Sequence, residues 1–291
     1  MTRVEESIVV SKEWQHIDRS LLQGLIMVMG APDVGKSSFA RWLLEQLEGE
    51  RAGLLVFLDG DPGQSVLGPP TTLTLAMIKA GERNLPRMGR ALRWFVGSTT
   101  PRGRMMSHVV GVARLVEAAR SEGAGTIVHD TTGLVSPAGG GVTLKLAKLD
   151  LLRPHTVIAI QRSRELEPLL KYLRHSSRPR LIELPCSASV SRRDCSARRL
   201  HRAEQFVRYF AGADTLKFNT GQTAFISQGR VHPNQLVSLE ESDGFTLALG
   251  VVVRDGRTVE IVTPLRETTR VYRLRCGDLI VDPGTGMHWF R

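Results

Sequence analysis

The sequence predicts an α/β fold with a mostly parallel β-sheet covered by helices, followed by a small all-β C-terminal domain. Four short segments are mostly apolar and resemble buried strands, at residues 25–29, 54–58, 126–129 and 156–160. Helical patterns at residues 37–48 and 109–119 lie between them. Strands that are apolar on both faces and separated by helices are typical of a parallel sheet with both faces covered.

The pattern changes after about residue 211, where apolar and polar residues begin to alternate with a period of two. The segment VVVRDGRTVEIV at 251–262 contains Asp255-Gly256 between two β-rich runs, which is a strong hairpin signal. Further runs at 246–249, 271–274 and 279–281 indicate a small barrel or sandwich of roughly five or six strands. We therefore predict two domains, 1–212 and 213–291.

The composition is that of a globular protein with a substantial core. Of 291 residues, 42 % are apolar and 23 % are charged, which excludes a disordered chain. No apolar run approaches the ~20 residues that span a bilayer, so we expect neither a membrane-spanning segment nor a membrane partner. The first residues, MTRVEES, are acidic where a signal peptide is basic, so the expected location is cytoplasmic. The three scattered cysteines, Cys186, Cys195 and Cys276, indicate reduced thiols without a disulfide framework or zinc site.

The basic charge is concentrated in one part of the chain. The sequence holds 39 Lys and Arg against 29 Asp and Glu, a net charge of +10. Residues 153–208 contain twelve Arg and one Lys against five acidic residues, which is most of this excess. Such a segment suits a polyanion such as nucleic acid or nucleotide phosphate. A solvated basic face without a partner explains the charge equally well.

The segment GAPDVGKS at 30–37 fits the pattern GxxxxGK[ST] between an apolar strand and an amphipathic helix. Its glycines let the backbone wrap closely around phosphate, and the helix N-terminus favours an anion. Lys36 can reach the β- and γ-phosphates, and the Ser37 hydroxyl can bind Mg²⁺. The sequence therefore predicts a P-loop nucleotide-binding fold. The candidate nucleotide-binding residues here are Gly30, Asp33, Val34, Gly35, Lys36, Ser37 and Ser38.

Acidic residues follow two of the predicted strands. Asp59 and Asp61 come at the end of the second strand, and Asp130 ends the strand TIVH before Thr-Thr-Gly. The carboxyl ends of parallel strands form the ligand-binding edge of such sheets. Either Asp59 or Asp61 could bind Mg²⁺ or accept a proton from an attacking hydroxyl. Asp130 is the candidate second metal-linked acid, and an ordinary turn is the alternative at each position.

An arginine-rich segment lies at 192–202. Arg198 and Arg202 are four residues apart and share one face of a helix, and Arg193 lies just upstream. Arginines that close over a triphosphate can neutralise charge on the transferring phosphoryl group. The alternative is a solvated basic helix, although like charges repel in a helix unless an anion is near.

Five segments in this order resemble the polynucleotide 5′-hydroxyl kinases related to the RNA kinase subunit of the eukaryotic pre-mRNA cleavage complex and to the nucleolar pre-rRNA-processing kinase. They are GAPDVGKSS (30–38), LDGDPGQ (58–64), FVGSTTP (95–101), DTTGLV (130–135), which precedes the lysines at 145 and 148, and RRDCSARRLHRAEQFVRYF (192–210). The resemblance runs from about Val10 to Phe210 and is weaker through the β-rich part.

The resemblance implies a role for several residues. Asp61 would be the base for the 5′-hydroxyl group, with Asp59 nearby, and Thr100 would lie in a clasp over the phosphates. Arg193 and Arg198 would be the arginines of a lid at about 186–210. The residues assigned to nucleic-acid binding are Gln64, Arg199 and Arg202, and those assigned to the metal are Ser37, Asp59 and Asp130.

These observations predict a kinase that transfers the γ-phosphoryl group of ATP or GTP, with Mg²⁺, to the 5′-hydroxyl end of RNA or DNA. The catalytic residues would be Lys36, Asp61, Arg193 and Arg198. A nucleotide-bound scaffold or switch protein is the alternative, because a P-loop and strand-end acids suit a switch as well. A small-molecule kinase is a third possibility, and it predicts no salt-dependent binding of oligonucleotides. The sequence leaves open whether the protein has protein partners.

Overall fold

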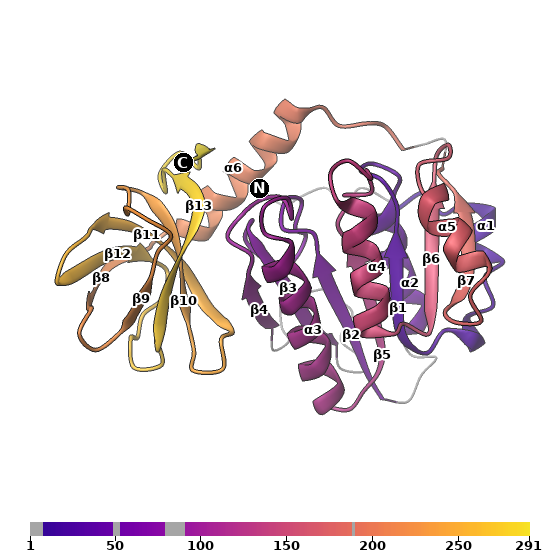
Figure 1. Cartoon of the computed structure of the whole chain (residues 1–291), viewed down its shortest axis with the longest axis horizontal. Helices are drawn as coiled ribbons and strands as arrows, with labels where there is room; N and C mark the ends of the chain where they lie inside the picture. The colour runs from indigo at the N-terminus through magenta and orange to yellow at the C-terminus, as the bar shows by residue number, and fades with distance from the viewer. Residues whose placement is uncertain (1–7, 49–52, 79–90, 188–189) are drawn as a thin grey trace. The chain divides into compact units, whose positions relative to one another are not determined.

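The computed structural model describes residues 8–48, 53–78, 91–187 and 190–291 (Figure 1). The first seven residues, on which the expected location partly rests, and residues 188–189 of the predicted lid lie outside this part. None of the described helices is long and apolar enough to cross a membrane.

The predicted fold class is confirmed. The helices are α1 (Lys12–Gln15), η1 (Arg19–Leu21), α2 (Lys36–Leu47), α3 (Met105–Ser121), α4 (Gly141–Leu152), α5 (Glu167–Arg174) and α6 (Cys195–Phe210). The strands of the first sheet are β1 (Gly24–Met29), β2 (Leu54–Gly60), β3 (Thr72–Ile78), β4 (Ala91–Phe95), β5 (Ala124–Thr131), β6 (Thr156–Gln161) and β7 (Arg180–Pro185). Those of the second are β8 (Asp214–Asn219), β9 (Ala224–Ile226), β10 (Gln235–Glu240), β11 (Thr246–Arg254), β12 (Thr258–Thr263), β13 (Arg273–Val281) and β14 (His288–Phe290).

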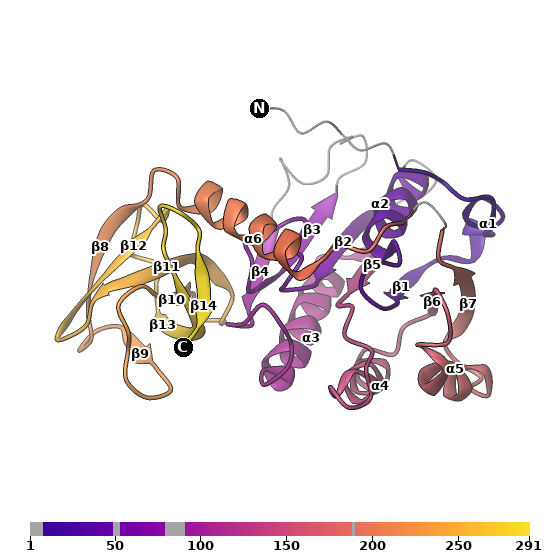
Figure 2. The same cartoon turned by 90° about the horizontal axis from the view of Figure 1, so that it is seen from above.

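The first sheet has the strand order β4-β3-β2-β5-β1-β6-β7. β1 pairs in parallel with β5 and β6, β2 with β5, and β6 with β7. Figure 2 shows α4 and α5 on one face of this sheet and α2 on the other. The central strands are buried along almost their whole length, which is why they are rich in apolar residues.

The second sheet is mostly antiparallel, with the order β14-β13-β10-β11-β12-β8 and β9 beside β13. The predicted hairpin is formed by β11 and β12, with Val252 opposite Ile261 and the turn at Asp255-Gly256. Two hydrophobic clusters lie on alternating positions of its strands. One of them packs Phe206 and Phe210 of α6 and Phe95 of β4 against the sheet.

The chain forms two compact units. The first comprises Met1–Gly60, Leu75–Arg90 and Val116–Arg192, and the second comprises Asp61–Thr74, Ala91–Leu115 and Arg193–Arg291. The second unit therefore holds α6 together with the β-rich sheet, and its hydrophobic cluster draws on both sides of residue 212. The predicted domain boundary near residue 213 stays a prediction.

Candidate functional site

The P-loop connects β1 to α2 in the first unit. Gly35 directly precedes α2 with φ +90°, and Asp33 has φ +54°, so the loop uses left-handed conformations at both positions. A side chain at Gly30 would meet the carbonyl oxygen of Ile160 at 2.5 Å. Lys36 is buried and its Nζ donates to the carbonyl oxygen of Ala31 at 2.6 Å. The loop thus presents the N-terminus of a helix that suits an anion.

Two buried carboxylates lie on the adjacent strands β2 and β5, of which β5 pairs with β1. Asp59 of β2 is opposite Asp130 of β5, and Asp130 is also opposite Val28 of β1. Their relative exposures are 0 % and 1 %. Paired positions of parallel strands lie about 4.8 Å apart, so the two acids are close to each other. Both lie at the carboxyl ends of the strands, where β1 leads into the P-loop.

This donor set fits Mg²⁺. The described residues contain no group of three or more His, Cys, Asp or Glu that could hold a metal by itself. A hydroxyl at Ser37 and carboxylates at Asp59 and Asp130 leave other coordination positions for water and phosphate oxygens. Mg²⁺ is usually bound through a few protein oxygens with water and substrate phosphates.

The loop after β5 lies directly against the P-loop. A Cβ on Gly133 would come within 2.8 Å of the backbone nitrogen of Pro32. The hydroxyl of Thr131 donates to the carbonyl oxygen of Val28 at 2.8 Å. The segment that follows Asp130 therefore touches both the P-loop and the strand that precedes it.

A buried basic layer supports this loop from α4. Lys145 Nζ donates to the hydroxyl of Thr131 at 2.5 Å and to the carbonyl oxygen of Thr132 at 2.6 Å. Lys145 and Lys148 are both fully buried. Burial, followed by the charges of Lys148 and Lys145, holds the pKa of the buried His129 well below its usual value. The sequence alone indicated no role for these side chains, although two lysines three residues apart in an apolar helix are a signal for an interior polar partner.

Arg162, after β6, is another residue for which the sequence indicated no role. Its Nη2 donates to the carbonyl oxygen of Asp33 at 2.7 Å and to that of Val190 at 3.2 Å. Val190 also lies close to Gly35, since a Cβ there would meet its Cγ2 at 3.3 Å. The guanidinium group thus ties the P-loop to the segment before Arg192.

Asp61 belongs to the second unit, where its loop contacts the predicted clasp. Asp61 Oδ1 accepts hydrogen bonds from the backbone nitrogens of Gly63 at 2.9 Å and Gln64 at 3.1 Å. A Cβ on Gly63 would meet the carbonyl oxygen of Thr99 at 2.3 Å. The hydroxyl of Thr100 accepts from the backbone nitrogen of Arg102 at 3.3 Å. The half-buried carboxylate of Asp61 and the clasp are therefore neighbours within this unit.

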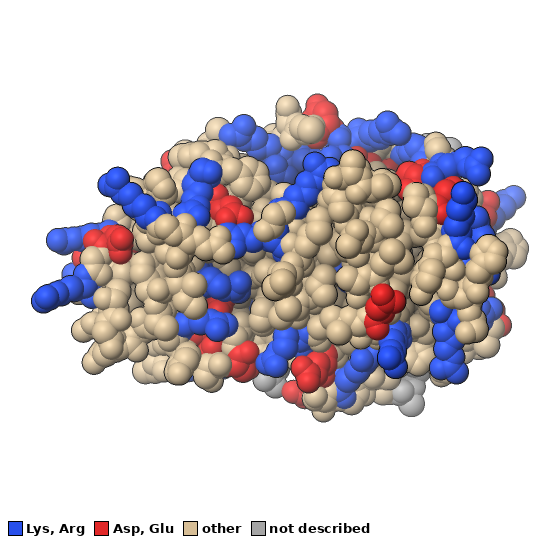
Figure 3. Space-filling view, viewed as in Figure 1, with Lys and Arg blue, Asp and Glu red and all other residues tan. Residues whose placement is uncertain are grey.

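Helix α6 carries the predicted lid arginine Arg198. Asp194 caps the N-terminus of this helix by accepting from the backbone nitrogen of Ala197 at 2.6 Å. Arg193 precedes the helix and is exposed, whereas Arg198 is half-buried. In Figure 3, Lys and Arg side chains gather in the upper part of the view, over α6. This face is basic, as the charge pattern predicts.

Arg199 and Arg202 also make contacts within the protein. Arg199 Nη2 donates to the carbonyl oxygen of His288 at 3.1 Å, and Arg202 Nε donates to His288 Nε2 at 3.1 Å. Arg202 interacts electrostatically with Asp61, while its burial lowers the pKa of its guanidinium group. On the same face of α6, Gln205 Nε2 donates to the carbonyl oxygen of Ser65 at 2.7 Å. The sequence did not predict the contacts with β14.

The predicted site residues therefore fall into two groups. The first unit brings together the P-loop residues with Asp59 and Asp130. The second unit contains Asp61, Gln64, Thr100, Arg193, Arg198, Arg199 and Arg202. Asp59 of the first group and Asp61 of the second are separated in the chain by Gly60 alone.

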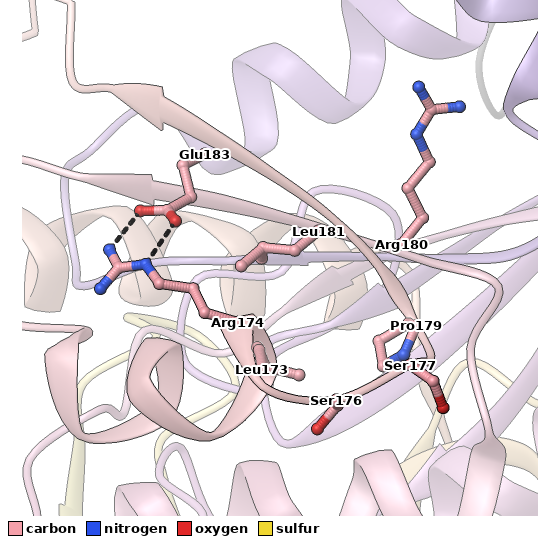
Figure 4. Close-up of a pocket in the computed structure, with 8 residues that line it drawn as sticks. All are labelled: Leu173, Arg174, Ser176, Ser177, Pro179, Arg180, Leu181 and Glu183. Atoms are coloured by element: carbon pink, nitrogen blue, oxygen red, sulfur yellow. Dashed lines mark hydrogen bonds and ion pairs between the residues drawn. The ribbon is translucent and has the colours of Figure 1, made fainter.

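A cavity of about 480 Å³ lies elsewhere in the first unit, between the end of α5 and β7 (Figure 4). It is lined by Leu173, Arg174, Ser176, Ser177, Pro179, Arg180, Leu181 and Glu183. Arg174 donates to Glu183 at its wall, at 2.7 and 2.6 Å. The cavity lies near the beginning of β7, whereas the P-loop follows the end of the parallel strand β1. None of the predicted site residues lines it.

A strand, a glycine-rich loop with a lysine and a serine opening a helix, and buried acids on the neighbouring strands define a P-loop nucleotide-binding protein. Residues 30–212 match the model of the family described as the mRNA cleavage and polyadenylation factor CLP1 P-loop. This match covers more than half of the chain, so the protein belongs to the CLP1 P-loop family.

Curated relatives support this assignment. The chain is 32 % identical over 231 residues to a polyribonucleotide 5′-hydroxyl-kinase of Thermococcus kodakarensis, covering 79 % of this chain and 64 % of the relative. It is 33 % identical over 187 residues to one of Methanocaldococcus jannaschii, covering 64 % of this chain and 50 % of the relative. The chain thus spans between half and two thirds of the length of these relatives.

Solved structures share the fold. A complex of wild-type Clp1p with a Pcf11p segment contains a chain that matches with a TM-score of 0.64 at 11 % identity, covering 87 % of this chain and 73 % of that one. At such low identity the likeness bears on the fold alone, and it agrees with the α/β architecture described above.

Proposed function

We propose that this protein is a polynucleotide 5′-hydroxyl kinase, which transfers the γ-phosphoryl group of ATP or GTP to the 5′-hydroxyl end of RNA or DNA. The observation that carries this proposal is a third carboxylate, the half-buried Asp61, in addition to the buried acid pair Asp59 and Asp130. A nucleotide switch needs no proton acceptor, whereas a kinase acting on a hydroxyl does. The names of the archaeal relatives support the same activity.

The P-loop would bind the triphosphate. Its backbone and the N-terminus of α2 attract the phosphates, and Lys36 would exchange its hydrogen bond with Ala31 for one with the β- and γ-phosphates. Ser37, Asp59 and Asp130 would hold Mg²⁺, which when bound neutralises phosphate charge. Thr100 would cover the phosphates from the clasp.

Asp61 would accept the proton of the substrate hydroxyl. The 5′-oxygen forms a bond to the γ-phosphorus as the bond from that phosphorus to the β-phosphate oxygen breaks, and the diphosphate leaves. Arg193 and Arg198 would stabilise the negative charge on the transferring group. Such positioning and charge stabilisation account for most of the catalysis of phosphoryl transfer.

The polynucleotide would be held by Gln64, Arg199 and Arg202, within the basic segment. Contacts of arginine with a phosphate backbone make binding salt-dependent, so affinity should fall as salt rises. To bind nucleic acid as well, Arg199 and Arg202 would have to use N–H groups other than those that donate to His288.

We also propose that the protein is located in the cytoplasm and that its two domains meet near residue 213.

The experiment is a transfer assay with γ-labelled ATP and GTP. RNA and DNA oligonucleotides are offered with either a 5′-hydroxyl or a 5′-phosphate end, and the products are separated by electrophoresis. We expect label on the 5′-hydroxyl strands and none on the 5′-phosphate strands. A protein that binds nucleotide yet labels no strand would be a scaffold or switch, and one that labels only small molecules would be a different kinase.

A further inference from the structure

The last strand of the chain makes a specific contact with the arginine helix. His288 of β14 is 6 % exposed, and its ring lies 5.5 Å from that of Phe206 of α6. Its Nδ1 is 3.1 Å from the carbonyl oxygen of Gly286, which can only accept a hydrogen bond. Nδ1 therefore carries the hydrogen, and Nε2 accepts the hydrogen bond from Arg202 Nε at 3.1 Å. The geometry requires a neutral histidine.

The turn before β14 is built to approach α6 closely (Figure 2). Gly286 has φ +69°, and a Cβ on it would come within 2.0 Å of the carbonyl oxygen of Ala203. Arg199 Nη2 donates to the carbonyl oxygen of His288 at 3.1 Å. One face of α6 is thus in contact with the β13–β14 turn and with β14, through Arg199, Arg202 and Ala203.

The Nη side of the Arg202 guanidinium group faces the loop that contains Asp61. Arg202 Nη1 is 3.5 Å from the carbonyl oxygen of Gly63, and its guanidinium group interacts electrostatically with Asp61. Gln205, three residues later, donates to the carbonyl oxygen of Ser65 in the same loop at 2.7 Å. All these residues belong to the second unit.

We propose that His288 is a positioning residue, which orients the guanidinium group of Arg202 beside Asp61. A guanidinium group is planar, so an acceptor at Nε fixes the directions of both Nη atoms. With Nε bound to His288, the Nη donors are turned to the Gly63 carbonyl and the Asp61 loop. The C-terminal strand would in this way set the geometry of the residue that accepts the proton of the 5′-hydroxyl.

The inference rests on the proposed kinase function for its kinetic consequence only, because the contact itself has its own measurement. A purely structural His288 would serve by packing against Phe206, and its hydrogen bond would be incidental. The two roles predict different behaviour for side chains that keep the packing and lose the acceptor.

The test compares two variants of the full chain. His288→Phe keeps an aromatic ring against Phe206 but cannot accept from Arg202, whereas His288→Gln offers an amide oxygen as acceptor. Trp289→Ala is the matched control, because it lies next in the same strand and its side chain points to the other face of the sheet. Thermal unfolding checks that each variant is folded.

The first measurement is the ¹H–¹⁵N signal of the Arg202 Nε–H group, identified by its absence in Arg202→Lys. We expect this proton to be protected from exchange in the wild type, in His288→Gln and in Trp289→Ala, and unprotected in His288→Phe. The second is kcat and KM for a 5′-hydroxyl oligonucleotide, where we expect kcat/KM to fall about tenfold in His288→Phe and to be largely restored in His288→Gln.

Two results would overturn the inference. One is unchanged protection and kinetics in His288→Phe, and the other is an equal loss in His288→Gln. If His288→Phe does not fold, His288→Leu takes its place as the variant without an acceptor, and in combination with Arg202→Lys it must cost no more than Arg202→Lys alone. If the wild type transfers no phosphate, the kinase proposal fails, and the exchange measurement still decides whether His288 orients Arg202.

Discussion

Gly133 lies against Pro32, so that a Cβ on the glycine would come within 2.8 Å of the proline nitrogen and 3.0 Å of its Cα. The loop after β5 and the P-loop are therefore in backbone contact, with no room for a side chain between them. Neither atom belongs to a flexible side chain that could move aside.

Gly133→Ala should therefore displace the P-loop. We expect at least a tenfold weaker affinity for the nucleotide, since small displacements of a phosphate-binding loop are costly. Equilibrium binding of a labelled triphosphate measures this. Gly125→Ala, at the start of β5 with open space around it, is the control and should bind normally. Normal binding by Gly133→Ala would show that the contact does not fix the P-loop.

Asp61→Asn tests the proposed base. The amide oxygen can still accept from the backbone nitrogens of Gly63 and Gln64, so the loop should keep its shape. The amide cannot take the proton, so kcat should fall by roughly 10² to 10⁴ with triphosphate affinity little changed. A steady-state assay with separate nucleotide binding measures both.

Asp282→Asn is the matched control for this variant. Asp282 Oδ1 likewise accepts from two backbone nitrogens, those of Gly284 and Thr285, in a turn of the same unit. Its kinetics should match the wild type. Loss of nucleotide binding in Asp61→Asn would assign Asp61 to the metal and the base to Asp59, and unchanged turnover would remove it from the reaction.

Arg193→Lys and Arg198→Lys test the lid. Lysine keeps the charge but not the forked donors of a guanidinium group, so general attraction for nucleic acid should persist. We expect kcat to fall at least about tenfold in each, with nucleotide affinity affected less. Arg208→Lys is the control, because Arg208 is exposed on the same helix and pairs with Glu204. If both lysine variants turn over at the parent rate, α6 is a passive basic face.

Tyr209→Phe tests how α6 is joined to the β-rich sheet. The Tyr209 hydroxyl accepts from the backbone nitrogen of Leu249 at 2.7 Å, and burial raises the pKa of this tyrosine. Phenylalanine would leave the Leu249 N–H without its acceptor, which costs about 1–3 kcal/mol. Denaturant unfolding should show this loss of unfolding free energy. Tyr272 is exposed, so Tyr272→Phe is the control and should leave the unfolding free energy nearly unchanged. Equal stabilities would mean that water replaces the hydroxyl.

The parts of the fold that could be predicted are those with local signals. β1, β2, β5 and β6 contain continuous apolar runs because both of their faces are buried, and the acids of β2 and β5 come after these runs. The P-loop was predictable because its glycine and lysine spacing follows directly from phosphate binding. β3, β4 and β7 were missed. β3 is buried but alternates Thr and Leu, so it does not form a continuous apolar run. β4 is only half-buried and β7 is largely exposed, and neither has a clear period.

The contacts between distant residues could not be predicted. Arg202 and His288 are 86 positions apart, and no sequence pattern relates an arginine helix to a histidine in the last strand. The hydrogen bond from Arg162 to Asp33 spans 129 positions. The sequence indicated which residue types could act in binding or catalysis. The contacts of these residues depend on the tertiary structure, which brings distant segments together.

Lys36 carries the central claim most directly, because phosphoryl transfer should depend on it while the fold does not. The measurement is the transfer of label from γ-labelled triphosphate to the end of a 5′-hydroxyl RNA, by the wild type and by Lys36→Ala. Lys171→Ala, on the exposed face of α5, is the control. We predict labelled 5′ ends with the wild type and the control and none with a folded Lys36→Ala. Equal labelling by Lys36→Ala, in protein free of other kinases, would contradict the assignment of the P-loop as the phosphoryl-transfer site.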